Sequence, residues 1–212
     1  MIKTMTLICF IFCCLHVRGQ YPGYVLLVDQ TETFKKSFTR ATASAETIQS
    51  EFTQEKSLTM LSEKINSTGK FWYRKNDKLR MEYIRPYPYL LILNEGKIFV
   101  KDSGKENKVS AGSNKIFKQI NRILIDCVGG SMLDNPDFQS RVFENDRSYL
   151  VEFKPLAKNL RELYKNINIV IDKKDYSAMA IEMFEISGDK TIIRFQNKEI
   201  NAHIPDSVFN IP

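Results

Sequence analysis

The side chains that could perform covalent or metal chemistry are few. A thiol–imidazole dyad would need Cys127 and His203, because the remaining cysteines and His16 all lie in the first 16 residues. Cys127 falls on the apolar stripe of a predicted helix, where a free cysteine is usually a buried structural residue. One cysteine and one histidine are too few for the ligand clusters that hold zinc or iron. We therefore expect no metal site and no cofactor.

Other catalytic motifs are incomplete. The stretch VGGSML at 128–133 lacks the second glycine of the G-x-S-x-G motif of serine hydrolases. The stretch SGDKTIIRF at 187–195 contains a Lys-Thr pair but not the earlier glycine of a phosphate-binding loop. The sequence thus indicates a protein that is not an enzyme.

The N-terminus has the features of a cleaved export signal. Lys3 precedes an apolar run over 5–15, and Val17 and Gly19 occupy the two positions that a signal peptidase reads. The run is shorter than the roughly 20 apolar residues of a membrane-spanning helix. We expect residues 1–19 to be a signal peptide and residues 20–212 to form a single exported domain. Loss of Lys3 and Arg18 lowers the formal net charge from +6 to +4, which is mildly basic.

The stretch at 69–102 mixes aromatic and basic residues, as a surface for single-stranded nucleic acid would. Alternation argues against that function. In an extended KLRMEY segment at 78–83 the apolar side chains share one face and the charged ones share the other. A nucleic-acid platform needs aromatic and basic residues on the same face, so we expect no nucleic-acid partner. The residues predicted to face inward from this stretch are Phe71, Tyr73, Leu79, Met81, Tyr83, Ile98 and Val100.

Two segments have the periodicity of amphipathic helices. The first covers residues 30–50, with its apolar stripe on Phe34, Phe38, Ala41, Ala45 and Ile48. The second covers residues 113–127, and the glycines at 129 and 130 can end it. Its stripe consists of Ile116, Phe117, Ile120, Ile123, Leu124 and Cys127.

The remaining segments are short, strand-like and separated by turn residues, which is typical of an antiparallel meander. A sheet of this size curls, and the two helices can cover its concave side. The covered face is then either an ordinary packed core or a cavity for an apolar ligand, and periodicity alone does not separate the two.

The order of these segments resembles the LolA family of periplasmic lipoprotein carriers. The resemblance covers nearly the whole exported chain and rests on EFTQEKSL at 51–58, GKFWYRKNDKLRMEY at 69–83, INRILIDCVGG at 120–130 and FEISGDKTIIRFQN at 184–197. It implies a mainly antiparallel β fold with helices (α+β), an open barrel of about eleven strands with a helical lid over an apolar cavity.

The resemblance also implies a function. A member of this family binds the acyl chains of lipoproteins in the periplasm and shuttles them from the inner to the outer membrane. Its partners are acylated lipoproteins, an ATP-driven (ABC-type) inner-membrane transporter that loads it, and an outer-membrane acceptor, and we expect it to act as a monomer. Three alternatives stay open: an exported carrier of another amphiphile such as a glycolipid or pigment, an envelope sensor or acceptor with the same fold, and an exported hydrolase, which the missing nucleophile–base set disfavours.

The resemblance assigns roles to particular residues. The cavity is expected between Phe34, Phe38 and the inward residues of 69–102, with Leu79 and Met81 in place of a bulkier aromatic pair. The lid is the helix that carries Ile116, Phe117, Ile120, Ile123 and Leu124. An arginine that latches the lid in this family matches Lys75, and Asn76 replaces the following proline. Because lysine lacks the planar fork of arginine, the latch falls to Lys75 or to the adjacent Arg74.

Overall fold

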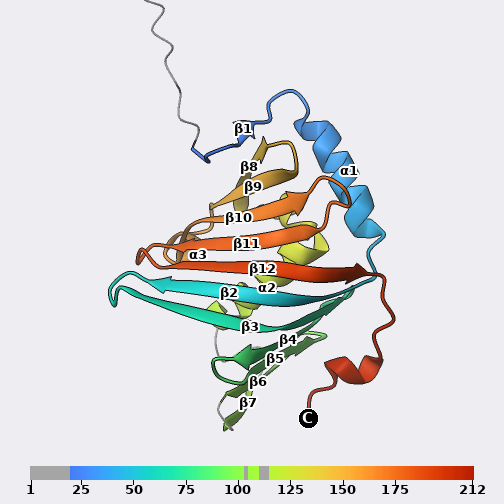
Figure 1. Ribbon diagram of the computed structural model, residues 1–212, viewed down its shortest axis with the longest axis vertical. Helices are drawn as coiled ribbons and strands as arrows, with labels where there is room; N and C mark the ends of the chain where they lie inside the picture. The colour runs from blue at the N-terminus through green and yellow to red at the C-terminus, as the bar shows by residue number, and fades with distance from the viewer. Residues whose placement is uncertain (1–19, 103–104, 110–114) are drawn as a thin grey trace, which may run out of the picture.

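The computed structural model describes residues 20–102, 105–109 and 115–212, with side chains for 20–102 and 122–212. The predicted signal peptide, residues 1–19, lies outside the described residues. Within them the strands form one antiparallel sheet of twelve (Figure 1). The strands are β1 (Val25–Leu26), β2 (Thr47–Leu58), β3 (Glu63–Arg74), β4 (Lys78–Arg85), β5 (Tyr89–Asn94), β6 (Lys97–Asp102), β7 (Lys105–Val109), β8 (Phe138–Glu144), β9 (Ser148–Pro155), β10 (Tyr164–Asp172), β11 (Ala178–Glu185) and β12 (Lys190–Ile200).

The sheet is open. Its order is β1-β8-β9-β10-β11-β12-β2-β3-β4-β5-β6-β7, so β1 and β7 stand at opposite ends. Since β1 has only two residues, the described sheet consists in effect of eleven strands, which confirms the open antiparallel barrel expected from the sequence. Tight turns fix the register of its hairpins. For example, Glu95 and Gly96 both have positive φ (49° and 79°) in the two-residue turn between β5 and β6, the geometry that suits a twisted hairpin.

Two long helices accompany the sheet, α1 (Thr31–Ala43) and α2 (Lys115–Gly129). The shorter helical segments are η1 (Ser131–Asp134), α3 (Lys158–Arg161) and η2 (Asp206–Phe209). Both long helices were predicted, but the first is shorter than its stripe suggested. Ala45 lies beyond the end of α1, and Ile48 is a buried residue of β2. No helix in the described part of the chain is both long and apolar enough to cross a membrane.

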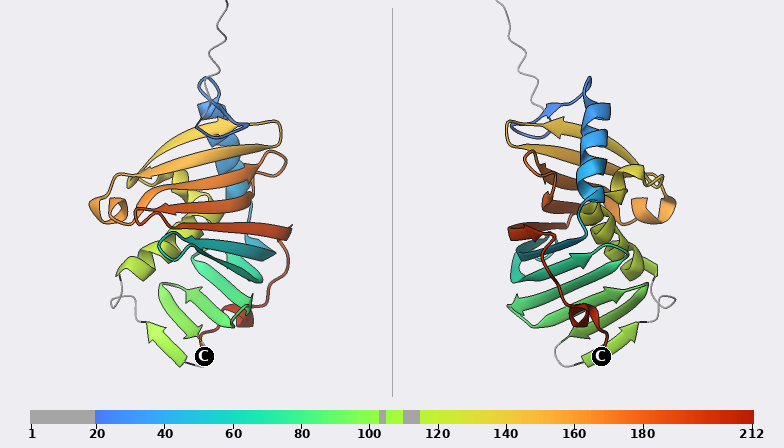
Figure 2. Two further views of the ribbon diagram at one scale, coloured as in Figure 1. Left: turned by 60° about the vertical axis from the view of Figure 1, so that its left-hand side comes forward. Right: turned by 90° about the vertical axis from the view of Figure 1, so that its right-hand side faces the viewer.

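The curved sheet has an inner face that packs against both helices (Figure 2). Alternate residues of each strand point to this face, including Phe52 of β2, Val151 of β9 and Ile169 of β10, which are at most 1% exposed. Phe34 and Phe38 of α1 belong to the same contiguous apolar cluster. The hydrophobic core therefore lies between the inner face and the helices.

The outer face was expected to be charged and solvated, and this is only partly correct. Ile92 and Phe99 point outward, yet both are fully buried. They lie in the region where the C-terminal segment packs on the sheet through η2: Asn94 of β5 donates to the Phe209 carbonyl, and Arg74 of β3 lies 5.3 Å from the centre of the Phe209 ring. Alternation along one strand did not reveal this cover, because it comes from residues more than 100 positions away.

Candidate functional site

The inner face brings together the side chains that the sequence predicted to face inward. Phe71, Tyr73, Leu79, Met81, Ile98 and Val100 are all buried in one apolar cluster with Phe34 and Phe38. Tyr83 is partly buried against it, stacked edge-on against Phe52 at 4.9 Å between ring centroids. Its hydroxyl donates to Gln54 at 2.9 Å, which satisfies a polar group at the edge of the apolar surface. Strand alternation was thus sufficient to find this surface.

Helix α2 covers this surface with its C-terminal half. Ile123 and Leu124 are 3% and 6% exposed and belong to the inner cluster, as do Ile125, Cys127 and Val128. The side chains of Ile116, Phe117 and Ile120, also predicted for this face, lie outside the described residues. Burial of Ile125 was not predicted, since it is off the apolar stripe. The last turns of α2 are therefore enclosed on more than one side.

Under the described C-terminal half of α2 there is little free space at one place. A cavity of about 10 Å³ remains between Val128 of α2 and the inner face, close to the smallest volume that holds a single water molecule. An acyl chain is far larger than this. A hydrocarbon ligand would therefore fit at this place only if the described part of α2 moved away.

The end of α2 is fixed by a close approach and by polar contacts. A side-chain carbon at Gly129 would lie 2.6 Å from the hydroxyl oxygen of Tyr73, so only glycine allows the helix to sit this near β3. Arg122 donates from Nη1 to both carboxylate oxygens of Asp77, at 3.1 Å, and from Nε to Asp126 at 2.8 Å. Asp77 belongs to the turn between β3 and β4. No local pattern indicated this contact, because the two residues are 45 positions apart.

Of the predicted latch residues, Arg74 is the last residue of β3 and Lys75 is the first residue of the same turn. The Lys75 ammonium donates to the carbonyl oxygen of Ala43 at 2.8 Å and to Glu46 at 2.9 Å. Ala43 is the last residue of α1, so Lys75 joins this turn to the end of a helix, but that helix is α1. Arg74 donates to the Asp206 carboxylate and to the Ile204 carbonyl in the C-terminal segment. Among the described residues 74–77, it is therefore Asp77 that contacts α2, through Arg122.

The only thiol and imidazole of residues 20–212 do not form a catalytic pair. Cys127 is 2% exposed in α2, whereas His203 is exposed in the C-terminal segment. Burial, and then the charge of Asp126, raise the pKa of the Cys127 thiol well above its usual value, which disfavours the reactive thiolate. Among the described residues no group of three or more potential ligands could hold a metal ion.

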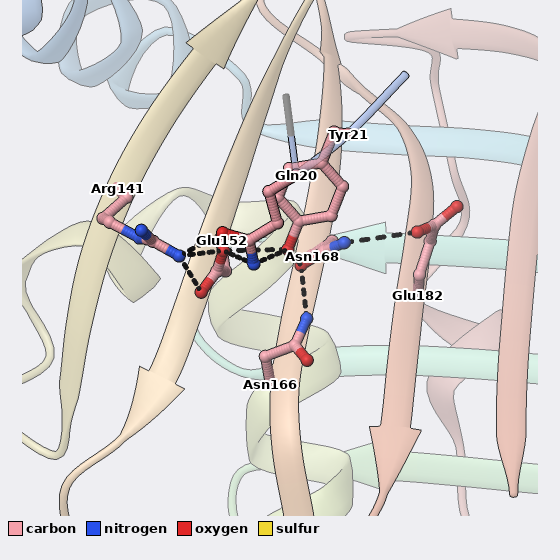
Figure 3. Close-up of polar contacts among 7 residues, drawn as sticks. All are labelled: Gln20, Tyr21, Arg141, Glu152, Asn166, Asn168 and Glu182. Atoms are coloured by element: carbon pink, nitrogen blue, oxygen red, sulfur yellow. Dashed lines mark hydrogen bonds and ion pairs between the residues drawn. The ribbon is translucent and has the colours of Figure 1, made fainter. Parts of the chain in front are cut away.

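A buried polar network on the outer face fixes the N-terminal segment (Figure 3). The Glu152 carboxylate, 4% exposed, accepts hydrogen bonds from Gln20 Nε2 (3.0 Å), Tyr21 Oη (2.8 Å) and Arg141 Nη2 (2.8 Å). Tyr21 also donates to Asn168, which is fully buried on β10, at 3.3 Å. Burial and the bond to Glu152 raise the pKa of Tyr21. The network was not predicted, because Glu152 looked like one more solvated charge on a strand.

The fold and the site together define a class of protein: an open antiparallel half-barrel whose apolar inner face is covered by an amphipathic helix. The family model described as outer membrane lipoprotein carrier protein LolA matches residues 43–212. The chain therefore belongs to the LolA family.

Solved structures share this fold at low sequence identity. The MucA/MucB complex of Pseudomonas aeruginosa aligns at 10% identity with a TM-score of 0.52, over 85% of this chain and 60% of that one. An uncharacterized conserved protein from Thermus thermophilus aligns at 8% identity with a TM-score of 0.51, over 86% and 95%. A LolA superfamily protein from Nitrosomonas europaea aligns at 8% identity with a TM-score of 0.45, over 85% and 97%. No curated protein sequence matches the chain. The two likenesses with a TM-score above 0.5 establish the fold alone.

Proposed function

We propose that the protein is a periplasmic carrier, which binds the acyl chains of lipoproteins beneath α2 and moves the lipoproteins from the inner to the outer membrane. The description of its family as outer membrane lipoprotein carriers supports this function. In this proposal residues 1–19 direct export and are removed, and residues 20–212 act as one domain without catalytic activity.

The observation that carries the proposal is the way α2 covers the inner face. The strands are joined by ladders of backbone hydrogen bonds, whereas the backbone bonds of a helix are internal. Helix α2 is held by apolar packing, by one close approach at Gly129 and by the exposed pair Arg122–Asp77. It can therefore leave the sheet without breaking a ladder. Hydrocarbon chains could then replace the apolar contacts that α2 makes, with Phe34, Phe38 and the inward residues of β3, β4 and β6 as the lining.

The physical need for such a carrier is large. Three acyl chains of about 15 carbons each, at about 0.8 kcal/mol per methylene, would cost on the order of 35 kcal/mol to transfer through water. An apolar interior removes most of this penalty. Binding must still be reversible, and competition between α2 and the acyl chains for the same surface keeps the net affinity moderate.

The direction of transport needs a partner. Transport from the inner to the outer membrane has a direction if loading of the carrier is coupled to a reaction that releases free energy. In this proposal an ABC-type transporter of the inner membrane loads the carrier and obtains that free energy from ATP hydrolysis. An outer-membrane acceptor would take the cargo by binding it more strongly. We propose Lys75 and Arg74, with Asp77, as the turn residues that stabilise the closed form.

Native mass spectrometry of the protein purified from its own envelope tests the proposal. The expected result is a complex whose added mass is that of a diacylated or triacylated peptide or protein. A small free lipid such as a glycolipid in its place would favour a carrier of another amphiphile. A protein that carries no acyl-containing molecule at all would contradict the proposal.

A variant of α2 tests whether this helix forms the lid. Leu124→Asp places a charge on the apolar surface of the helix, so that the displaced helix can no longer pack on bound hydrocarbon. We expect this variant to lose the lipoprotein while the sheet remains folded, as judged by circular dichroism. Retention of the lipoprotein at the level of the unchanged protein would show that α2 does not form the lid.

A further inference from the structure

A bulge in β12 turns a lysine toward the apolar inner face. The strand pairs regularly with β2 from Lys190 to Gln196. From Gln196 to Glu199, however, β12 advances by three residues while its partner β2 advances by only two, from Glu51 to Gln49. One extra residue is thus accommodated in β12, and Asn197 within it has a φ of 51°. Without the bulge, Lys198 would point to the face opposite Phe195. In the structure both line the same cavity under α2, because a bulge re-aims the side chains that follow it.

The cavity beside this bulge is lined by both apolar and polar groups. Phe71, Phe195 and Val128 contribute apolar walls, and Ser50, Ser177 and Lys198 contribute the polar groups. Val128 belongs to α2, so displacement of the helix would open the cavity onto the rest of the inner face. The polar groups would then border the apolar surface of the inner face.

The hydroxyl of Ser50 is a buried polar group without a partner. Ser50 is 8% exposed, and its Oγ makes no hydrogen bond to any of the described residues. Such a group is destabilising relative to a satisfied one, so it is rare in a folded protein. Ser50 lies on β2 across from the bulge, between the partners of Gln196 and Glu199. An unused hydroxyl that lines a cavity is available to a ligand.

Lys198 is held at the same place by a short chain of hydrogen bonds. Its ammonium donates to Ser177 Oγ, and Ser177 Oγ donates in turn to Asp175 at 2.6 Å. Lys198 forms no ion pair with any carboxylate of the described residues. The charges of Asp175 and Asp172 are nevertheless near enough to favour the charged form of Lys198. Burial outweighs them and lowers the pKa of Lys198. A half-buried ammonium with one of its three N–H groups used in this way can still donate to an anion or a carbonyl oxygen.

We propose that Lys198 and Ser50 form a subsite for the polar end of an acyl chain, where they donate hydrogen bonds to its carboxylate or ester carbonyl oxygen, and that Ser177 holds the Lys198 ammonium in position. The inference rests on the proposed function, since the hydrocarbon would lie along the inner face that α2 uncovers. A free fatty acid and the ester or amide of an acylated protein present the same acceptor oxygen. The subsite fixes which end of the chain stays near β12.

Displacement of the fluorophore N-phenyl-1-naphthylamine by laurate, methyl laurate and dodecane tests the subsite. The three ligands share a twelve-carbon chain and differ in charge and in the presence of an acceptor oxygen. A hydrogen bond from a charged donor corresponds to about a tenfold change in affinity or more. We therefore expect Lys198→Met to weaken laurate and methyl laurate about tenfold and to leave dodecane unchanged. Loss for laurate alone identifies a free carboxylate as the ligand group, and loss for both identifies the carbonyl oxygen.

Two further variants keep the test decisive. Lys154→Met removes an exposed lysine of β9 and should leave all three affinities unchanged. Ser50→Ala removes only the unpartnered hydroxyl, so it should fold at least as well as the unchanged protein and weaken methyl laurate about threefold. If the unchanged protein binds all three ligands and neither Lys198→Met nor Ser50→Ala alters their order, the subsite is wrong and the carrier function stands. If the unchanged protein binds none of them, both proposals fall.

Discussion

Replacement of Ile123 by alanine tests whether α2 is a lid or an inseparable part of the core. Ile123 is 3% exposed, so its side chain is almost entirely buried between α2 and the sheet. Loss of a fully buried isoleucine side chain typically costs about 2–5 kcal/mol. If α2 opens by itself, this whole amount is subtracted from the free energy of local opening. Each 1.4 kcal/mol changes the equilibrium constant of local opening about tenfold. The amides of α2 should therefore exchange about 30-fold to several thousand-fold faster than in the unchanged protein.

Native-state hydrogen exchange with mass spectrometry measures this effect. Peptides from α2 should lose protection in Ile123→Ala, while peptides from β9 and β10 keep most of theirs. Ile192→Ala is the matched control: Ile192 is 6% exposed on the outer face of β12 and is not part of the inner cluster. That variant should lower global stability without a selective effect on α2. Equal loss of protection in α2 and the strands in Ile123→Ala would refute the lid, because helix and sheet would then open only together.

Three further results are expected. Asp77→Asn removes an exposed ion pair with Arg122, worth less than about 1 kcal/mol, and leaves the contact of Arg122 with buried Asp126 in place, so exchange in α2 should rise less than about fivefold, and added salt should produce a similar rise in the unchanged protein; a larger effect would make this pair a main restraint. Because burial raises the pKa of Cys127, iodoacetamide at about pH 8 should modify the native thiol much more slowly than the urea-unfolded one; equal rates would contradict the burial. Phe209→Ala should lower the free energy of unfolding in urea by about 3–5 kcal/mol, since Phe209 is 1% exposed; a change below about 1 kcal/mol would mean that the C-terminal segment does not stabilise the sheet.

Much of the fold could be predicted from the sequence. Alternation in KLRMEY placed Leu79 and Met81 on the inner face, and the 3.6-residue period placed Ile123 and Leu124 on the buried side of a helix. Both predictions succeeded because strand and helix periodicity are local properties of the chain. The lining, lid and latch functions of these residues remain predictions.

The errors and omissions have a common cause. The stripe of α1 continued in sequence to Ile48, but the chain leaves the helix after Ala43 to pair β2 with β3 and β12. Ile92 and Phe99 appeared to face solvent, and the C-terminal segment buries that part of the outer face. In each case the deciding partner is distant along the chain, so no window of neighbouring residues contains it.

The sequence by itself determined the class of the protein through two local patterns: which residues alternate in the strands, and where the helices lie. The tertiary structure decided that the C-terminal half of α2 packs on the inner face, that Asp77 and Arg122 meet, and that the bulge turns Lys198 into the cavity that Ser50 lines. The physical reason is that periodicity fixes the direction of a side chain relative to its own strand or helix. Contact, burial and charge pairing depend on which distant segment arrives opposite it.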